Sequence, residues 1–307
     1  MSLKRIIVCD SGLGGLDIAE KFFLPFSGVK DPGKVEGYEV FYFNAFPDSA
    51  TGYNDLPSEK AQEEVFRCAL EGMKKFSPDQ CLIACNTLSI IYDRLKQWYT
   101  PAFPVEGIVE CAVKGMNSFM QERSASAQLL ILGTLTTVGS AVYENGLLAS
   151  GVEKERLFSL AVPGLARKLE SGVETGDVQK LIREAAQKAA LLLPCNTPET
   201  PLALGLCCTH YGFAAQALEK AFREATGRKE IYILNPNEWM CPQEMRGKGK
   251  SFSYHARIDF FPGSRENMKE YFLSRNIPCI PQTLEQAQKE SDLFEFQAHY
   301  RNKELKI

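Results

Sequence analysis

The chain has 307 residues, enough for one large or two ordinary domains with a substantial core. Apolar residues make up 45% of it, charged residues 24%, and the net charge is −3. This balance favours a globular protein and gives no reason to expect nucleic acid or a membrane as a partner. No apolar run approaches the ~18 residues of a membrane span, and a strand pattern begins at residue 4, so we expect no signal peptide and a cytoplasmic location.

Apolar runs alternate with helical patterns along most of the chain, which predicts a parallel α/β fold. We predict strands at residues 4–9, 38–43, 80–84, 104–109, 128–132, 156–161, 202–207, 230–234 and 254–260. We predict helices at residues 14–24, 58–76, 87–98, 110–122, 139–149, 163–171, 176–192, 210–226 and 264–274. Turn-forming residues predict loops at 27–36 and 194–201, and the segment 241–253, which has no periodicity, is predicted to be a surface loop.

The first strand leads into the glycine-rich turn DSGLGG, which begins at Asp10. Gly12 and Gly14 match the first two glycines of a dinucleotide fingerprint, but Asp17 stands at the third position, which disfavours a dinucleotide site. The glycines could serve only a tight turn. We favour a turn that lets Asp10 and Ser11 reach a small substrate, because a carboxylate at the end of a strand has no obvious packing role.

Two cysteines, Cys85 and Cys208, each stand where a strand pattern changes to a helical one. A helix N-terminus stabilises a thiolate and lowers the thiol pKa below ~8.5. Cys85 lies 75 residues after Asp10, and Cys208 lies 75 residues after Gly133, which ends another strand. This repeat predicts two pseudo-symmetric α/β lobes with mostly parallel sheets facing a central cleft, one from residues 1–103 and 217–307 and one from 104–216. The paired thiols suggest two acid–base groups acting on one substrate from opposite sides.

Polar residues follow the same strands. They are Asn86 and Thr87 after Cys85, Thr134 and Thr137 after Gly133, and Thr209 and His210 after Cys208. Such side chains could cap helices or could cradle carboxylates, and the sequence leaves both readings open. A metal held by Cys207, Cys208 and His210 is disfavoured, because the usual ligand spacing is missing.

Several segments, taken in order, carry a resemblance to a known family. They are DSGLGG, ACNT followed by an apolar helix, GIVE at 107–110, LGTLTTVGSAVY at 132–143 and CCTHY at 207–211. Together they resemble the cofactor-independent Asp/Glu racemase superfamily and, within it, the glutamate racemases. The later segment RIDFFPGSRENMKEYF resembles the closing strand and helix of that family.

The resemblance implies an isomerase that interconverts L- and D-glutamate, a peptidoglycan precursor, with no cofactor and no metal. Cys85 and Cys208 would be the two catalytic bases, assisted by Asp10 and His210 respectively. The partner would be a small acidic amino acid, and a homodimer is left open. The residues expected to hold the substrate are Ser11, Thr51, Gly52, Asn86, Thr87, Thr134, Thr137 and Thr209.

Two departures from the family pattern concern the substrate. Family members usually carry a Pro-Tyr-Gly turn after the second strand and a glutamate in a Pro-x-Val-Glu turn near the second catalytic pair. Here the corresponding positions read Ala50-Thr51-Gly52 and Pro163-Gly164-Leu165-Ala166. We therefore expect the acidic side chain of the substrate to be held differently, with aspartate or another acid as the alternative substrate.

Two readings outside the superfamily remain. A Cys–His hydrolase would use Cys208 as its nucleophile and His210 as its base, although it would leave the second cysteine module without a purpose. A binding protein derived from a racemase would have no activity.

Overall fold

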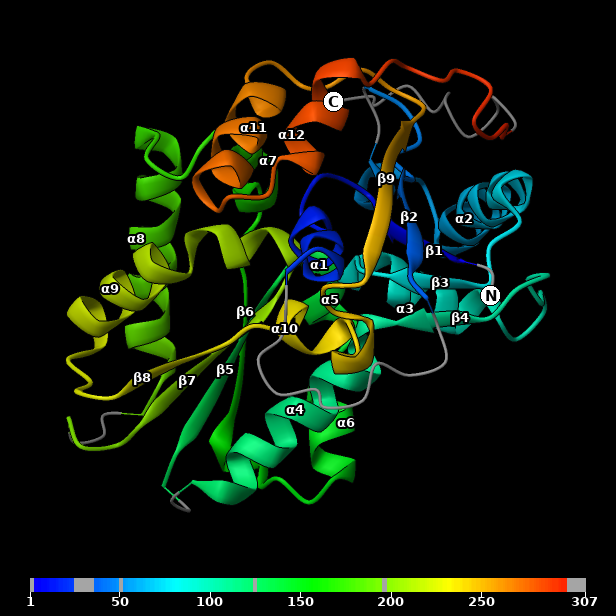
Figure 1. Cartoon of the computed structure of the whole chain (residues 1–307). Coiled ribbons are helices and arrows are strands. Elements are labelled where there is room, and N and C mark those ends of the chain that lie inside the picture. Colours follow the sequence, from blue (N-terminus) through cyan, green and yellow to red (C-terminus); the bar gives the residue numbers. More distant parts are fainter. Residues whose placement is uncertain (1–2, 25–35, 50–51, 124–125, 195–197, 297–307) are drawn as a thin grey trace. The chain divides into compact units, whose positions relative to one another are not determined.

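The computed structural model describes residues 3–24, 36–49, 52–123, 126–194 and 198–296 (Figure 1). The chain divides into two compact units, Met1–Gly107 with Cys241–Ile307, and Ile108–Met240. Residues 217–240, which we predicted in the first lobe, belong to the second unit, because strand β8 (Ile231–Leu234) pairs with strand β7 (Leu202–Cys207). Among the described residues, no helix is long and apolar enough to cross a membrane.

The first unit is built on a parallel sheet with the strand order β4-β3-β1-β2-β9 (Figure 1). Its strands are β1 (Lys4–Asp10), β2 (Tyr38–Asn44), β3 (Gln80–Ile83), β4 (Val105–Gly107) and β9 (Gly249–Ala256). Its α-helices are α1 (Leu16–Ala19), α2 (Glu59–Met73), α3 (Asn86–Leu95), α11 (Ser264–Ser274) and α12 (Cys279–Gln286). Its 3₁₀ turns are Glu20–Phe22, Tyr53–Asp55, Lys74–Phe76 and Gln243–Met245.

The second unit is built on a parallel sheet with the strand order β6-β5-β7-β8. The strands not yet named are β5 (Gln128–Gly133) and β6 (Leu157–Ala161). Its α-helices are α4 (Ile108–Glu122), α5 (Leu135–Gly139), α6 (Val142–Ala149), α7 (Leu165–Glu170), α8 (Gly176–Leu192), α9 (Ala215–Thr226) and α10 (Asn237–Met240). Its 3₁₀ turns are Lys154–Arg156 and Thr209–Ala214.

The two sheets share one strand order, which confirms the predicted α/β class and the repeat. In each unit the first strand lies between the second and the third, and the fourth pairs with the third. Asp10 ends the first strand of its unit and Gly133 ends the first strand of the other. Cys85 and Cys208 each follow the third strand. Strand β9 has no counterpart among the described residues of the second unit.

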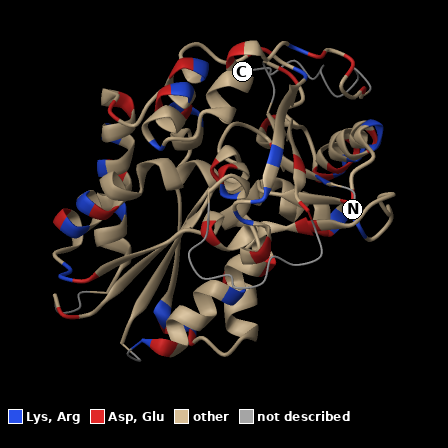
Figure 2. Ribbon diagram, viewed as in Figure 1, with Lys and Arg blue, Asp and Glu red and all other residues tan. Residues whose placement is uncertain are grey.

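Apolar helix faces hold both sheets in place. Helix α2 begins after Ser58, whose Oγ accepts a hydrogen bond from Ala61 N, and its apolar face buries Phe66 and Leu70 in the core that contains Cys85. Helices α7, α8 and α9 enclose the corresponding core of the second unit. Figure 2 shows that β5, β6 and β7 carry no charged residue, whereas charges line α8 and α9. Each fully buried leucine or phenylalanine contributes about 1.5–3 kcal/mol, so the strand ends project from rigid layers.

Several predicted elements were wrong in position or missing. Strand β9 covers Gly249–Ala256 and not 254–260, so the predicted loop 241–253 ends in a strand. Helices α5 and α12 were not predicted, and the predicted helix 139–149 begins only at Val142, because Ala141, which separates α5 from α6, has φ +52°. Residues 14–24 form only the four-residue helix α1 and a 3₁₀ turn. The predicted loop 27–36 lies almost entirely outside the described residues.

Candidate functional site

In the first unit, Cys85 lies at the carboxyl end of β3 and caps α3, as predicted. Its Sγ accepts a hydrogen bond from Leu88 N at 3.5 Å, and the thiol is buried with 7% of the residue exposed. Ser11 Oγ lies 3.2 Å from Cys85 Sγ, a hydrogen bond in which either atom can be the donor. When the thiol is ionised, the hydroxyl and the helix N-terminus both favour the thiolate. Ser11 and Cys85 therefore form a hydrogen-bonded pair in which the hydroxyl can donate to the thiolate.

Asp10 ends β1, the strand that pairs with β3, and only 1% of it is exposed. Gly15 makes room for it, because a Cβ at position 15 would lie 2.9 Å from both Asp10 Oδ2 and Ala84 Cβ. The glycine-rich turn thus allows the chain to fold tightly over a buried carboxylate. The hydrogen bond to the Cys85 thiol comes from Ser11, the neighbour of Asp10.

The other predicted residues of this unit fall in two places. Asn86 and Thr87 are buried in the first turn of α3, directly beside Cys85. Gly52 donates its backbone N–H to Asp55 Oδ2 at 2.9 Å, which closes the turn before the 3₁₀ segment Tyr53–Asp55. Thr51 lies outside the described residues.

In the second unit, Cys208 follows β7 and leads into a 3₁₀ segment, Thr209–Ala214, where we had predicted an α-helix capped by Thr209. Its Sγ lies 3.8 Å from His210 Nδ1, and His210 Nε2 lies 2.7 Å from Glu170 Oε1. All three residues are buried. Because a short 3₁₀ segment offers a weaker dipole than α3, the support for this thiol comes mainly from the histidine and the glutamate.

The protonation of His210 follows from these contacts. Burial works against the imidazolium, but the hydrogen bonds to Cys208 and Glu170 and the charge of Glu170 outweigh it and raise the pKa of His210 well above its usual value. In its protonated form the ring donates Nε2–H to Glu170 and directs Nδ1–H at Cys208. The cation stabilises a thiolate at Cys208 and can return a proton to it.

Glu170 corrects our expectation that the second pair lacks a carboxylate. We had assigned the family's glutamate to the position of Ala166, but Glu170 lies four residues later on α7 and contacts His210. Positions i and i+4 share one helix face, so a carboxylate one turn further along occupies the same side of α7. That spacing is the sequence signal that could have identified Glu170.

The remaining predicted residues also lie at strand ends. Thr134 caps α5 by accepting from Thr137 N at 3.2 Å, and the two threonine hydroxyls lie 3.0 Å apart. Thr209 is buried, and its carbonyl accepts a hydrogen bond at 2.9 Å from Asn237 Nδ2, a residue that the sequence did not single out. The threonines therefore cap and position the turns, and the first turn of α5 keeps a hydroxyl pair at the end of β5.

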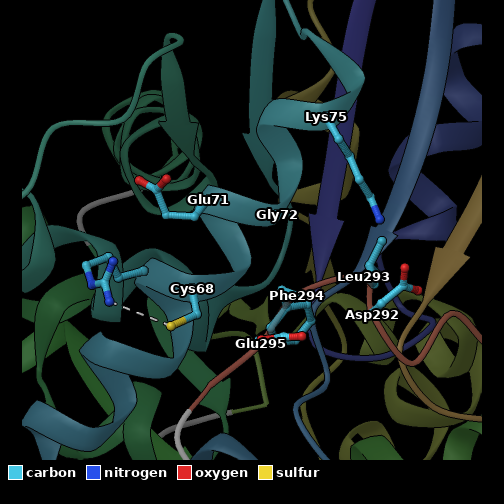
Figure 3. A pocket seen from close by; sticks show the side chains of 9 residues that line it. Cys68, Glu71, Gly72, Lys75, Asp292, Leu293, Phe294 and Glu295 are labelled. Atoms are coloured by element: carbon cyan, nitrogen blue, oxygen red, sulfur yellow. Dashed lines mark hydrogen bonds between the residues drawn. The ribbon is translucent and has the colours of Figure 1, made fainter.

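Two hollows of the first unit lie away from these residues. One, of about 480 Å³, lies between α2 and residues 292–295, with Cys68, Glu71 and Lys75 on its walls (Figure 3). Burial raises the pKa of the Cys68 thiol, so it is a poor nucleophile at neutral pH. The other, of about 450 Å³, is lined by residues that follow β2 and β9, such as Ser49 and Arg257. It lies at the carboxyl edge of the sheet, where ligands of parallel α/β folds bind.

Comparison with known proteins gives a consistent result. No family model matches the chain. The chain is 26% identical over 226 residues to the glutamate racemase of Campylobacter jejuni, a match that covers 72% of this chain and 79% of that one. It is also 26% identical over 273 residues to the glutamate racemase of Brucella ovis, a match that covers 89% of this chain and 87% of that one. The crystal structure of the C. jejuni glutamate racemase matches with a TM-score of 0.62 at 20% identity, covering 88% of this chain and 98% of that one.

A second solved structure extends the match. The glutamate racemase of Francisella tularensis, in complex with D-glutamate, matches with a TM-score of 0.60 at 18% identity, covering 88% of this chain and 94% of that one. At these identities the structural matches establish the fold, and the sequence matches extend over most of the same chain. The chain is therefore similar over most of its length to glutamate racemases and shares their fold.

Proposed function

We propose that the chain is an amino-acid racemase that interconverts L- and D-glutamate. The observation that carries the proposal is the equivalent placement of Cys85 and Cys208 after the third strand of two sheets with one strand order. Each thiol has its own polar support, Ser11 for Cys85 and His210 for Cys208. The relatives named above are glutamate racemases, and one of them was solved with D-glutamate bound, which supports glutamate as the substrate.

Inversion at an α-carbon explains why two thiols are needed. A weakly acidic hydrogen must leave one face of the carbon while another is delivered to the opposite face. In the proposed reaction, one cysteine acts as a thiolate and removes the proton, the other acts as a thiol and supplies one, and the roles reverse in the other direction. Free thiols titrate near ~8.5, close enough to neutral pH for both roles.

The supports differ in what they provide. Ser11 can donate its hydroxyl proton to the Cys85 thiolate, whereas the His210 imidazolium provides a full positive charge beside Cys208, with Glu170 holding the ring. Fixed donors at the strand ends, such as Thr87 and Thr134, would stabilise the second negative charge that develops next to the carboxylate of the substrate. Asp10 would assist Cys85 from the neighbouring strand end.

The chain departs from the family's substrate-binding pattern at fewer positions than the sequence indicated, which favours glutamate as the substrate. Glu170 stands in for the carboxylate that Ala166 had seemed to replace, which leaves the turn around Thr51 as the remaining departure. Aspartate is therefore the alternative substrate to be tested. The cysteines of the described residues are free thiols, which suits a reducing cytoplasm.

The test is turnover of each enantiomer of glutamate and of aspartate, followed by circular dichroism, with a parallel reaction in D₂O. We expect glutamate to racemise and product to carry deuterium at the α-carbon. Cys85→Ala and Cys208→Ala should each abolish turnover, while the controls Cys68→Ala and Cys111→Ala, one in each unit and both only partly buried, should keep it. Product that retains the original hydrogen, or full activity in either Cys85→Ala or Cys208→Ala, would refute the two-base reaction.

A specific observation favours one second candidate. Cys208, His210 and Glu170 form a chain of hydrogen bonds that also suits a Cys–His–Glu hydrolase, in which the thiolate attacks an acyl carbon. That reaction passes through a covalent acyl-enzyme and does not require Cys85. Mass spectrometry of the protein during turnover separates the two, because an acyl adduct on Cys208 with full activity in Cys85→Ala would favour the hydrolase.

A further inference from the structure

Tyr42 holds the turn that carries Ser11. It lies on β2, opposite Val8 of β1, and none of its surface is exposed. Its hydroxyl donates a hydrogen bond of 2.7 Å to the carbonyl oxygen of Gly12, the residue after Ser11. Because a buried hydrogen bond fixes the peptide unit that accepts it, the phenol holds the Gly12–Leu13 peptide and, with it, the turn that directly follows Ser11.

Strand β9 fixes the position of the phenol in turn. Tyr254 pairs with Tyr42 across the two strands, and their rings stack with centroids 5.5 Å apart and an interplanar angle of 8°. Asn44 Nδ2 donates to the Tyr254 hydroxyl at 3.1 Å, and Phe260 stacks on the other side of the Tyr254 ring. The ring of Tyr42 therefore has little freedom to turn its hydroxyl away from Gly12.

In the second unit a buried tyrosine also hydrogen-bonds to the backbone at a strand end, but this tyrosine does not lie on a strand. The Tyr211 hydroxyl lies 3.2 Å from both the Gly133 carbonyl at the end of β5 and the Val162 carbonyl after β6. Tyr211, like Tyr42, is fully buried. In each unit a buried phenol thus ties down the backbone at the edge of the sheet where the candidate thiol lies.

We propose that Tyr42 is a positioning residue whose hydroxyl, through the Gly12 carbonyl, keeps the Ser11 hydroxyl on the Cys85 thiol. This inference rests on the proposed function only for its effect on turnover, since the contact between Ser11 and Cys85 lies within the fold of the first unit. Without the phenol hydroxyl, the Gly12–Leu13 peptide can rotate, the turn that follows Ser11 loosens, and the thiolate loses a donor. The reactivity of Cys85 should then change without any change in the chemistry of Cys208.

The experiment measures alkylation of Cys85 by iodoacetamide between pH 6 and 10, read by peptide mass spectrometry, in the full chain without substrate. The variants are Tyr42→Phe, Ser11→Ala and the double variant. The control is Tyr38→Phe, which removes a buried phenol from the same face of β2 at its far end. At pH 7 we expect Tyr42→Phe to slow alkylation of Cys85 about tenfold by shifting the midpoint of the pH profile upwards, with an unchanged plateau at high pH, because only the thiolate reacts.

The double variant tests the route of the effect. If Tyr42 acts through Ser11, Tyr42→Phe should have no further effect in the Ser11→Ala background, and Cys208 should react at the wild-type rate in every variant. An unchanged midpoint in Tyr42→Phe, or effects that multiply in the double variant, would overturn the proposal. Because alkylation requires no turnover, a failure of the racemase proposal would appear in the glutamate assay and leave this result interpretable.

Discussion

Replacing Glu170 with glutamine removes the charge that holds His210 while keeping an oxygen that can accept a hydrogen bond. A hydrogen bond to a charged group is worth about 1.5–3 kcal/mol and one between neutral groups about 0.5–1.5 kcal/mol, so the change should cost about 1–2 kcal/mol. Since one pKa unit corresponds to about 1.4 kcal/mol, the pKa of His210 should fall by about one unit. In a unit of this size the melting temperature should fall by about 3–8 °C.

The pH dependence of that loss follows from the direction of the shift. The folded pKa of His210 lies above its unfolded value, so its contribution to stability is fully present below about pH 6.5. That contribution is lost as the pH rises through the folded pKa. The difference in melting temperature between wild type and Glu170→Gln should therefore be largest near pH 6 and should shrink towards alkaline pH.

Histidine NMR gives the most direct measurement, since the chain has only three histidines. The control is Glu290→Gln, because Glu290 Oε1 lies 2.7 Å from Nδ1 of another histidine, His255, in the first unit. We expect Glu170→Gln to lower the titration midpoint of His210 and to reduce kcat about tenfold, and Glu290→Gln to leave both unchanged. A wild-type His210 that titrates at or below its ordinary value, or a midpoint that Glu170→Gln leaves in place, would refute the reasoning.

Two further predictions concern the strand ends and the two directions of reaction. Gly133→Ala should lower activity and the free energy of unfolding measured in urea, because its Cβ would lie 2.9 Å from Thr137 Cγ2. The control Gly139→Ala should be neutral, because no atom lies within 4 Å of a Cβ at that position. Equal behaviour of the two variants would contradict this prediction. Asp10→Asn and His210→Asn should reduce kcat unequally for L- and D-glutamate, with KM compensating because the equilibrium constant is one. Equal losses in both directions for both variants would mean that these residues support the fold or orient the substrate.

The strands at 4–10 and 202–207 were predictable because residues 6–9 and 202–207 are buried and form continuous apolar runs. The position of strand β9 was predicted wrongly because β9 lies at the sheet edge beside β2 and leaves most of its residues at least partly exposed. Helix α12 was missed because Pro281 stands in its first turn, where proline is tolerated but weakens the helical signal.

In the site, as in the fold, residues with a local sequence signal were predictable, whereas contacts between residues distant in sequence were not. The cysteines and the polar residues that follow them could be located, because the carboxyl ends of parallel strands meet at one edge of a sheet. The helical spacing from Ala166 could have indicated Glu170 as a candidate, but its contact with His210 could not be predicted, because that contact depends on the packing of α7 against the turn after β7. The stacking of Tyr254 on Tyr42 joins residues of β2 and β9, between which the entire second unit is inserted.

That insertion has a consequence for biosynthesis. The second unit is one continuous stretch, Ile108–Met240, whereas the first needs β9, α11 and α12, which the ribosome makes last. During translation the second unit can therefore complete its sheet while β2 still has an unpaired edge. Until residue 256 has emerged, that edge is open to pairing with other nascent chains. A nonsense mutation or proteolytic cut shortly before Gly249 would leave a folded second unit attached to an aggregation-prone first one.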